Sequence, residues 1–333
     1  MMSPDELPDV LNEYVQGSEH PDICVYRRDV MDAPTLDAWK WRLKHFCDLG
    51  DFYNKRVLEV GAGFGWDAVG LALVGDNDVV AMDILPSMID GMSQCLATMA
   101  AKGRPISVTP MQGDICSLDL PDGSFDGIFS TEAIEHVHDL QQMFDNCFRL
   151  LRTGGKAVIV NDSNKYNESA RRHSWDAWKE RDESWDHVNW LKTEVRPVEH
   201  KEARPYGVAR EDMIRSADPD LDEATVTTLR AATAGMIKPE IDEAVFRFKR
   251  DGSLPEPDPY SWCRNPETGE YSERLLDPFQ LRTMLENSGF RTELRHLFRK
   301  APYRFFNSIR FRPLNERLFA VRPHFVLVAT KTA

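Results

Sequence analysis

The chain has 333 residues, of which 42% are hydrophobic, and a formal net charge of −13. This length and composition suffice for one large domain or a domain with a substantial insertion, and they exclude an intrinsically disordered chain. The acidic charge disfavours nonspecific binding to nucleic acid, which needs a basic face, and leaves only a local basic patch open.

The six cysteines are scattered without a C-x-x-C pair, which is typical of reduced thiols in a cytoplasmic protein. The sequence contains no recognisable N-terminal signal peptide and no apolar run long enough to span a membrane. We therefore expect a cytoplasmic protein that is neither secreted by that route nor membrane-spanning.

Residues 1–50 are expected to form an N-terminal arm followed by a helix. The arm, up to about Ala33, is acidic and weakly patterned, whereas apolar residues recur at helical spacing from Pro34 to Leu49 and Gly50 ends the pattern. This helix either covers the mouth of a ligand site or packs on the edge of a sheet.

The next stretch, from Arg56 to Leu73, has the pattern of a buried strand, a glycine turn and a helix. The turn carries E-x-G-x-G-x-G, starting at Glu59. Glycine allows the backbone to turn sharply and a ligand to approach bare amide groups. Trp66 stands near the place where a nicotinamide-binding turn would need its third glycine, so the dinucleotide fingerprint is not matched.

Four further strands alternate with helical patterns in the first half of the chain. They are expected at 78–82, 106–111, 125–130 and 156–160. This alternation predicts a doubly wound α/β fold with a parallel sheet. Asp83 follows the second of the five strands at its carboxyl end, where ligands bind in such sheets, and is placed to accept hydrogen bonds from a ribose diol.

Residues 56–161 resemble the catalytic core of the class I S-adenosylmethionine-dependent methyltransferases, with a type 11-like core. The matching motifs are LEVGAGFG from Leu58, Asp83, GDI at 113–115, STEAIEHV at 130–137 and LLRTGGKAVIV at 150–160. The resemblance implies a Rossmann-like, seven-stranded, mostly parallel sheet with a helical insertion after the fifth strand. It also implies S-adenosylmethionine as the cofactor.

The resemblance assigns the cofactor site residue by residue. Glu59 would face the cofactor's amino group below the glycine turn, although a strand acid bonded to backbone amides of the turn is the other interpretation. Asp83 would hold the ribose, and Asp114 would accept from the adenine amino group. The remaining positions are Gly61, Ala62, Gly63 and Gly65 at the methionine half, Ile84, Met88 and Ile115 beside the adenine, and Gly113, Ser130 and Thr131.

His136, just after the fourth strand, is the candidate for taking a proton from the acceptor. The alternative is a helix-entry histidine bonded to a backbone carbonyl. Glu132, Glu135 and His136 also form E-x-x-E-H, which resembles the divalent-ion ligands of ubiquinone-pathway O-methyltransferases and small-RNA 2′-O-methyltransferases. His187 would supply a further ligand; a surface acid cluster without an ion is the other interpretation.

About a hundred residues follow the fifth strand without continuing the sheet pattern, and in the family this segment supplies the acceptor pocket. The candidate acceptor residues are Tyr166, Asn167, His173, Trp175 and Trp178. Tryptophans that form the small core of a helical cap are the alternative. Further helices are expected at 220–236 and 239–249.

The last part of the chain is expected to complete the sheet with strands at 290–298 and 323–330, after a helix capped by Asp277 and Pro278. Residues 299–322 between them are basic and aromatic. They would contact an anionic acceptor or a membrane surface, or form a solvated connector or a subunit contact, with a homodimer as one arrangement. The expected units are thus an arm and helix (1–50), a cofactor-binding core (51–164), an acceptor-binding cap (165–276) and a closing part of the core (277–333).

The sequence predicts a biosynthetic enzyme that methylates a hydroxyl group, and secondarily an amine, of a small-molecule or glycan-type acceptor. Three alternatives stay open. They are a metal-assisted RNA 2′-O-methyltransferase, a cofactor-binding regulatory module without turnover, and a nicotinamide oxidoreductase with a similar fold.

Overall fold

A computed structural model describes residues 6–24, 33–195, 200–309 and 311–332. Parts of the expected N-terminal arm (1–5 and 25–32) and Arg310 of the basic segment lie outside the described residues.

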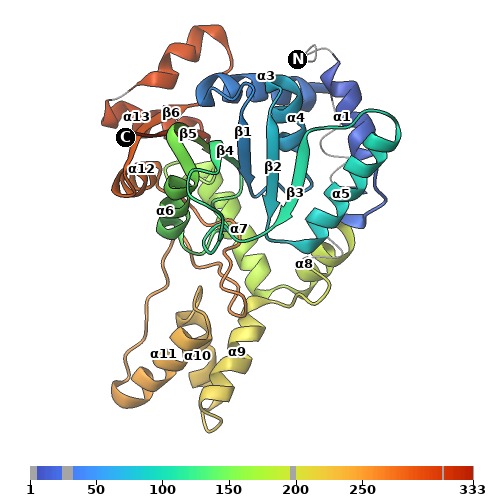
Figure 1. Cartoon of the computed structure of the whole chain (residues 1–333). Coiled ribbons are helices and arrows are strands. Elements are labelled where there is room, and N and C mark those ends of the chain that lie inside the picture. Colours follow the sequence, from blue (N-terminus) through green and yellow to red (C-terminus); the bar gives the residue numbers. More distant parts are fainter. Residues whose placement is uncertain (1–5, 25–32, 196–199, 310, 333) are drawn as a thin grey trace.

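A seven-stranded sheet forms the centre of the molecule (Figure 1), in the order β3-β2-β1-β4-β5-β7-β6. Its strands are β1 (Arg56–Val60), β2 (Asp78–Asp83), β3 (Val108–Gln112), β4 (Phe125–Thr131), β5 (Leu151–Asn161), β6 (Phe290–His296) and β7 (Phe325–Lys331). β7 pairs antiparallel with both β5 and β6, and the other pairs are parallel. The expected doubly wound sheet with an antiparallel last strand is confirmed.

Helices cover both faces of the sheet. One face packs against α1 (Leu7–Val15), α3 (Ala33–Gly50), α4 (Trp66–Gly75) and α5 (Pro86–Ala101). The other face packs against α6 (Leu140–Leu150), α12 (Pro278–Asn287) and Phe319 of α13 (Arg312–Val321). Successive residues of a strand point to opposite faces, so Glu59 lies on the α3 and α4 face together with Val57.

The segment after β5 is helical and has apolar clusters of its own. It contains α7 (Glu168–Glu183), α8 (Trp185–Trp190), a π-helical turn (Leu191–Val195), α9 (Tyr206–Ala217), α10 (Glu223–Ala232) and α11 (Lys238–Asp251). Figure 1 shows α9, α10 and α11 extending away from the sheet, and they pack around Ile214, Leu229 and Ile241. The helix expected at 220–236 is shorter because Asp222 caps its start by accepting from Thr225 N.

Strand ends differ from the sequence-based boundaries by a few residues. β5 begins at Leu151 instead of 156, and β6 ends at His296. The helix at Pro278 is capped as expected, since the Asp277 carboxylate accepts from Phe279 N and Gln280 N. The six cysteines all lie in the described ranges and form no disulfide, and no helix in these ranges is long and apolar enough to cross a membrane.

Candidate active site

The glycine turn between β1 and α4 lies at the carboxyl edge of the sheet. Gly61, Gly63 and Gly65 all have positive φ, at 73°, 54° and 83°. A β-carbon on Gly61 would lie 2.3 Å from the β-carbon of Ala133, whereas one on Gly63 would meet no atom within 4 Å. Gly63 therefore borders open space, which a ligand can fill, while Gly61 is fixed by close packing.

Glu59 lies beneath this turn and is only 1% exposed. Its Oε2 has no hydrogen-bond partner among the described residues. Burial, and then the nearby carboxylates of Asp67 and Asp83, raise its pKa well above the usual value, although a hydrogen bond from the Ala68 backbone opposes this. The backbone amide of Ala68 in α4 thus satisfies the acid only in part, and a cationic group would complete its environment.

Asp83 at the end of β2 closes the other side of the turn. Its Oδ2 accepts from Gly63 N at 2.7 Å and its Oδ1 accepts from Leu85 N at 3.0 Å. Each carboxylate oxygen has a second lone pair, so the residue can accept from a diol as well. Of the two expected adenine contacts nearby, Ile84 is 46% exposed and Met88 is buried.

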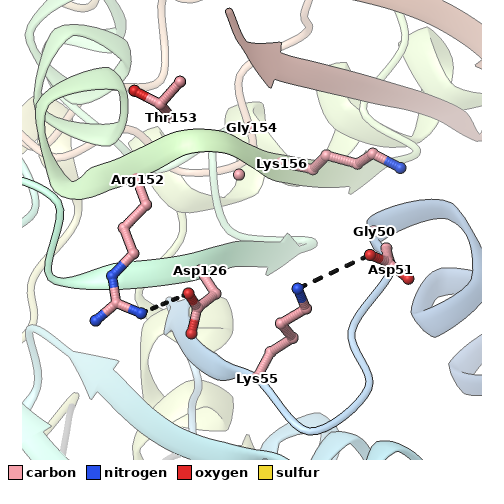
Figure 2. A pocket seen from close by; sticks show the side chains of 9 residues that line it. Gly50, Asp51, Lys55, Asp126, Arg152, Thr153, Gly154 and Lys156 are labelled. Carbon is pink, nitrogen blue, oxygen red and sulfur yellow. Dashed lines mark hydrogen bonds and ion pairs between the residues drawn. The ribbon is translucent and has the colours of Figure 1, made fainter. Parts of the chain in front are cut away.

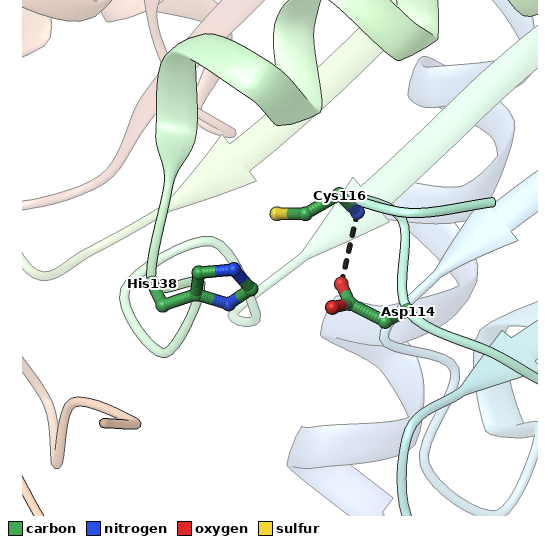
Figure 3. A group of neighbouring side chains, drawn as sticks. All are labelled: Asp114, Cys116 and His138. Atoms are coloured by element: carbon green, nitrogen blue, oxygen red, sulfur yellow. Dashed lines mark hydrogen bonds between the residues drawn. The ribbon is translucent and has the colours of Figure 1, made fainter. Parts of the chain in front are cut away.

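The end of β3 contributes the adenine-side motif. Gly113 N donates to Asp83 O at 3.0 Å, which joins this loop to β2. Asp114 accepts from Cys116 N, and Figure 3 shows both beside His138. Burial raises the pKa of the Cys116 thiol to about 11, and Ile115 is buried in the core.

The end of β4 is tied to its neighbours. Ser130 Oγ donates to Val60 O at 2.9 Å, and Thr131 is half-buried. Glu132 has a positive φ of 43°, and its Oε2 accepts from Asp162 N at 2.9 Å. His324 Nε2 lies 4.0 Å from Glu132 Oε1. Burial and the Asp162 and Glu135 carboxylates raise the pKa of Glu132.

Glu135 and His136 belong to a second group. Asn161 Nδ2 donates to Glu135 Oε2 at 2.5 Å, and burial raises the pKa of Glu135 to about 7. His136 Nδ1 lies 2.8 Å from Tyr271 O. A carbonyl only accepts, so Nδ1 carries the proton and the neutral ring has its lone pair on Nε2, which lies 3.7 Å from Glu273 Oε1.

The candidate metal ligands are thus divided between two groups. Among the described residues, Glu132 groups with Asp162 and His324, and Glu135 groups with His136 and Glu273. His187 lies in α8, where its Nδ1 is 3.1 Å from Glu180 of α7. The single set of ligands expected from E-x-x-E-H is divided because polar residues from distant segments lie at this edge of the sheet. They follow β5, precede β7 and precede α12, so the local motif does not contain them.

Two of the five candidate acceptor residues hold the protein together. Trp178 is 1% exposed and packs edge-on against Trp262, which leaves it no surface for an acceptor. Asn167 caps α7 and donates to Ala320 O. Trp175 and His173 are exposed, and Tyr166 is half-buried with its hydroxyl 3.2 Å from Asp277 Oδ2.

Other residues of the site have no strong sequence signal. Tyr14 of α1 donates to Phe64 O of the glycine turn at 2.6 Å, and Trp39 of α3 donates to Asp67 at 2.6 Å. Tyr271, Glu273 and His324 come from distant parts of the chain. Asn161 and Asp162, the first residues of NDSNKYN, do have a sequence signal, because they stand at the end of β5 where site residues are expected.

A separate hollow lies at the opposite edge, near the start of β1 and β4 (Figure 2). Four of its five charged residues pair with each other: Arg152 lies 2.6 Å from Asp126, and Lys55 lies 3.9 Å from Asp51. The fifth, Lys156, donates to Leu49 O at 3.3 Å. Because most of its charges are compensated, the carboxyl edge of the sheet is the better candidate for the site.

The fold and the glycine turn, with acids at three successive strand ends, define a nucleotide-type ligand site on a Rossmann-like sheet. Residues 58–159 match the family model described as "Methyltransferase domain". This part of the chain is a class I S-adenosylmethionine-dependent methyltransferase domain, whose cofactor is S-adenosylmethionine.

Similar proteins act on different atoms. The domain is 33% identical over 119 residues to phosphoethanolamine N-methyltransferase 3 of Arabidopsis thaliana, covering 35% of this chain and 23% of that protein. It is 35% identical over 109 residues to the ubiquinone biosynthesis O-methyltransferase of Rickettsia conorii, covering 33% of this chain and 35% of that protein. The chain thus spans about a quarter to a third of these relatives' length. A solved methyltransferase structure from Aquifex aeolicus is 12% identical over 100% of both chains, with a TM-score of 0.45.

Proposed function

We propose that the chain transfers a methyl group from S-adenosylmethionine to a hydroxyl group of a small-molecule or glycan-type acceptor. The observation that carries the proposal is the buried Glu59 carboxylate, whose Oε2 has no hydrogen-bond partner among the described residues, together with the open space beside Gly63. A buried acid of this kind needs a cationic ligand group, and the methionine part of the cofactor has an ammonium group.

Glu59, Asp83 and Asp114 would hold the cofactor at three points. Glu59 would face the amino group, Asp83 the ribose hydroxyls and Asp114 the adenine amino group. The exposed Ile84 side chain offers an apolar surface for the base. The backbone of the glycine turn, including Ala62, would pass close to the methionine part, while Thr131 at the end of β4 faces the same edge.

S-adenosylmethionine supplies a methyl group on a sulfonium, which an acceptor takes by direct in-line displacement. The protein therefore has to position the acceptor and remove its proton. His136 is suited to this, because its Nδ1–H bond to Tyr271 O fixes the ring and makes Nε2 the nitrogen that can accept a proton. Glu135 Oε1 and Glu273 Oε1, at 4.0 Å and 3.7 Å from Nε2, would stabilise the imidazolium that forms.

An amine acceptor is the second candidate. Four carboxylates, those of Glu132, Asp162, Glu135 and Glu273, gather near the ends of β4 and β5 in two groups. Such an edge attracts a cationic substrate. The cationic ammonium form has no lone pair and must lose a proton before it can attack the methyl group, so the same histidine would serve either acceptor.

The test has two stages. Calorimetry with the full chain should show binding of S-adenosylmethionine and none of NAD(H); failure to bind S-adenosylmethionine would overturn the proposal. Methyl-labelled cofactor is then supplied with a library of hydroxyl and amine acceptors, and the labelled atom is identified by NMR. Binding without any labelled product would favour a regulatory module.

The metal-assisted alternative is tested in the same assay. A chelator that abolishes transfer, with rescue by a divalent ion and activity on RNA termini, would favour an RNA 2′-O-methyltransferase. Unchanged turnover in the chelator would support proton removal by His136 alone.

A further inference from the structure

Residues 299–322, which join β6 to β7, expose several large apolar side chains. Ten such side chains are exposed in the described residues, and four of them lie in this short segment. They are Tyr303, Phe305, Phe311 and Val321, with exposed fractions between 51% and 73%. Monomeric proteins rarely concentrate large exposed apolar groups in this way unless the surface binds something.

The same segment is strongly basic in an acidic protein. It contains seven lysines and arginines and one acid, Glu316, although the net charge of the whole chain is −13. Glu316 pairs with Arg312 at 3.0 Å. Among the described residues, Arg304 and Arg317 are exposed and form no ion pair with an acid. Arg304 donates to Arg299 O at 2.9 Å and lies over the Trp41 ring, but no acid neutralises its charge, so both arginines can contact an anionic partner.

The exposure does not come from a loosely attached loop. Asn307 accepts from Phe298 N at 2.7 Å and donates to Phe298 O, which fixes the 3₁₀ helix Ala301–Ser308 to the end of β6. Asn315 of α13 donates to Ile309 O and lies 3.0 Å from His296 Nε2. Phe319 is buried against Phe279. A fixed framework therefore presents the aromatic side chains outward.

The segment leaves and re-enters the sheet at the edge of the candidate site. β6 runs parallel to β5, because both are antiparallel to β7, so His296, Phe325 and Asn161 lie in one row across the three strands. Asn161 contacts Glu135. Figure 1 shows α13 beside β6, away from α9, α10 and α11.

We propose that residues 299–322 dock the protein on an anionic lipid surface. The aromatic side chains enter the interfacial layer, where amphipathic rings are favoured, and the arginines contact lipid phosphates. A second copy of the chain fits less well, because a symmetric contact would place basic residues opposite basic residues. Nucleic acid fits less well because the whole chain has a net charge of −13, and because the aliphatic Val321, which is 73% exposed, has no flat face on which a base could stack.

The experiment is flotation of the full chain with two kinds of vesicle, phosphatidylcholine alone and phosphatidylcholine with phosphatidylserine. We expect binding to the anionic vesicles only, weakened by added salt. Arg304→Glu with Arg317→Glu should reduce binding by more than about 25-fold, because each cation near the surface contributes roughly five-fold. Phe305→Ser with Phe311→Ser should also reduce it.

The matched control is Phe246→Ser with Arg250→Glu on α11, where the phenylalanine is likewise exposed. The control should bind as the parent chain does, and circular dichroism checks that every variant folds. Equal binding to neutral vesicles, no binding, or equal losses in the control would overturn the proposal. RNA binding and self-association are measured by sedimentation. The proposal would also be overturned if the segment variants lost either of these while they still bound vesicles as the parent chain does.

Discussion

At the residue scale, Glu59 is a proposed ligand-binding residue whose burial opposes the stability of the fold. A buried carboxylate oxygen without a partner destabilises the folded chain when it is ionised, and its neighbours Asp67 and Asp83 add repulsion. Such a group is retained when a ligand completes its environment, so stability and cofactor binding should respond to it in opposite directions.

We expect Glu59→Gln to stabilise the cofactor-free protein at neutral pH by roughly 1–2 kcal/mol. The folded-state pKa is raised, so the folded chain holds a proton that the unfolded chain releases at about its usual value of 4.5. The destabilising effect of the carboxylate is therefore absent below that pH and grows as pH rises. Urea unfolding at several pH values measures the difference between variant and parent, and calorimetry should show weaker S-adenosylmethionine binding. A variant that is less stable at every pH would contradict this account.

His136→Ala should lower turnover by about 10²- to 10⁴-fold while the affinity for S-adenosylmethionine stays unchanged, because the imidazole acts on the acceptor. Asp83→Ala should do the reverse and mainly weaken cofactor binding. Single-turnover kinetics together with calorimetry separate the two effects. Unchanged cofactor affinity in the Asp83 variant would refute its assignment to the ribose.

At the scale of elements, α1 reaches the cofactor turn from outside the methyltransferase family match. The buried Tyr14 hydroxyl donates to Phe64 O within the turn and lies close to Gly65. The helix thereby positions a loop whose three glycines would otherwise allow many conformations.

Tyr14→Phe should leave the Phe64 carbonyl without this partner, lowering the free energy of unfolding by about 1–2 kcal/mol and weakening cofactor binding several-fold. Thermal unfolding and calorimetry measure the two quantities. Tyr53→Phe is the control, because Tyr53 donates instead to Asp48 on α3. Equal cofactor affinity in the Tyr14 variant and the parent would show that α1 supports the fold without positioning the turn.

At the scale of the whole molecule, the inserted helices are joined through a buried ion pair. Arg210 of α9 is 1% exposed, and its Nη1 and Nη2 donate to the two carboxylate oxygens of Asp182 in α7 at 2.5 and 3.0 Å. The pair holds the α9–α11 cluster against the helix that carries Trp175, which is one of the candidate acceptor residues.

Asp182→Ala should therefore destabilise the protein by about 3–5 kcal/mol, because it leaves a buried guanidinium uncompensated. We expect acceptor turnover to fall at temperatures where S-adenosylmethionine binding persists, since the cofactor turn lies in the other part of the chain. Asp176→Ala, on an exposed position of the same helix, is the control. If acceptor turnover and S-adenosylmethionine binding were lost at the same temperature, the insertion and the core would unfold together. Limited proteolysis followed by mass spectrometry locates the part that opens first.

The sequence by itself determined the sheet, the glycine turn and the acids at the strand ends. These features depend on local patterns, namely alternation of strands and helices, glycines where the turn needs positive φ, and caps such as Asp277. Glu59, Asp83 and Asp114 could be found because each stands at a fixed place relative to a strand.

Only the tertiary structure decided which side chains meet at the carboxyl edge. Glu132 and Glu135 are close in sequence, but they lie in separate groups: Asp162 after β5 and His324 before β7 lie beside Glu132, and Glu273 lies beside Glu135. Trp178 is likewise a core residue because it packs against Trp262, which lies far along the chain. Contacts between distant segments follow from packing, which no local pattern in one sequence encodes.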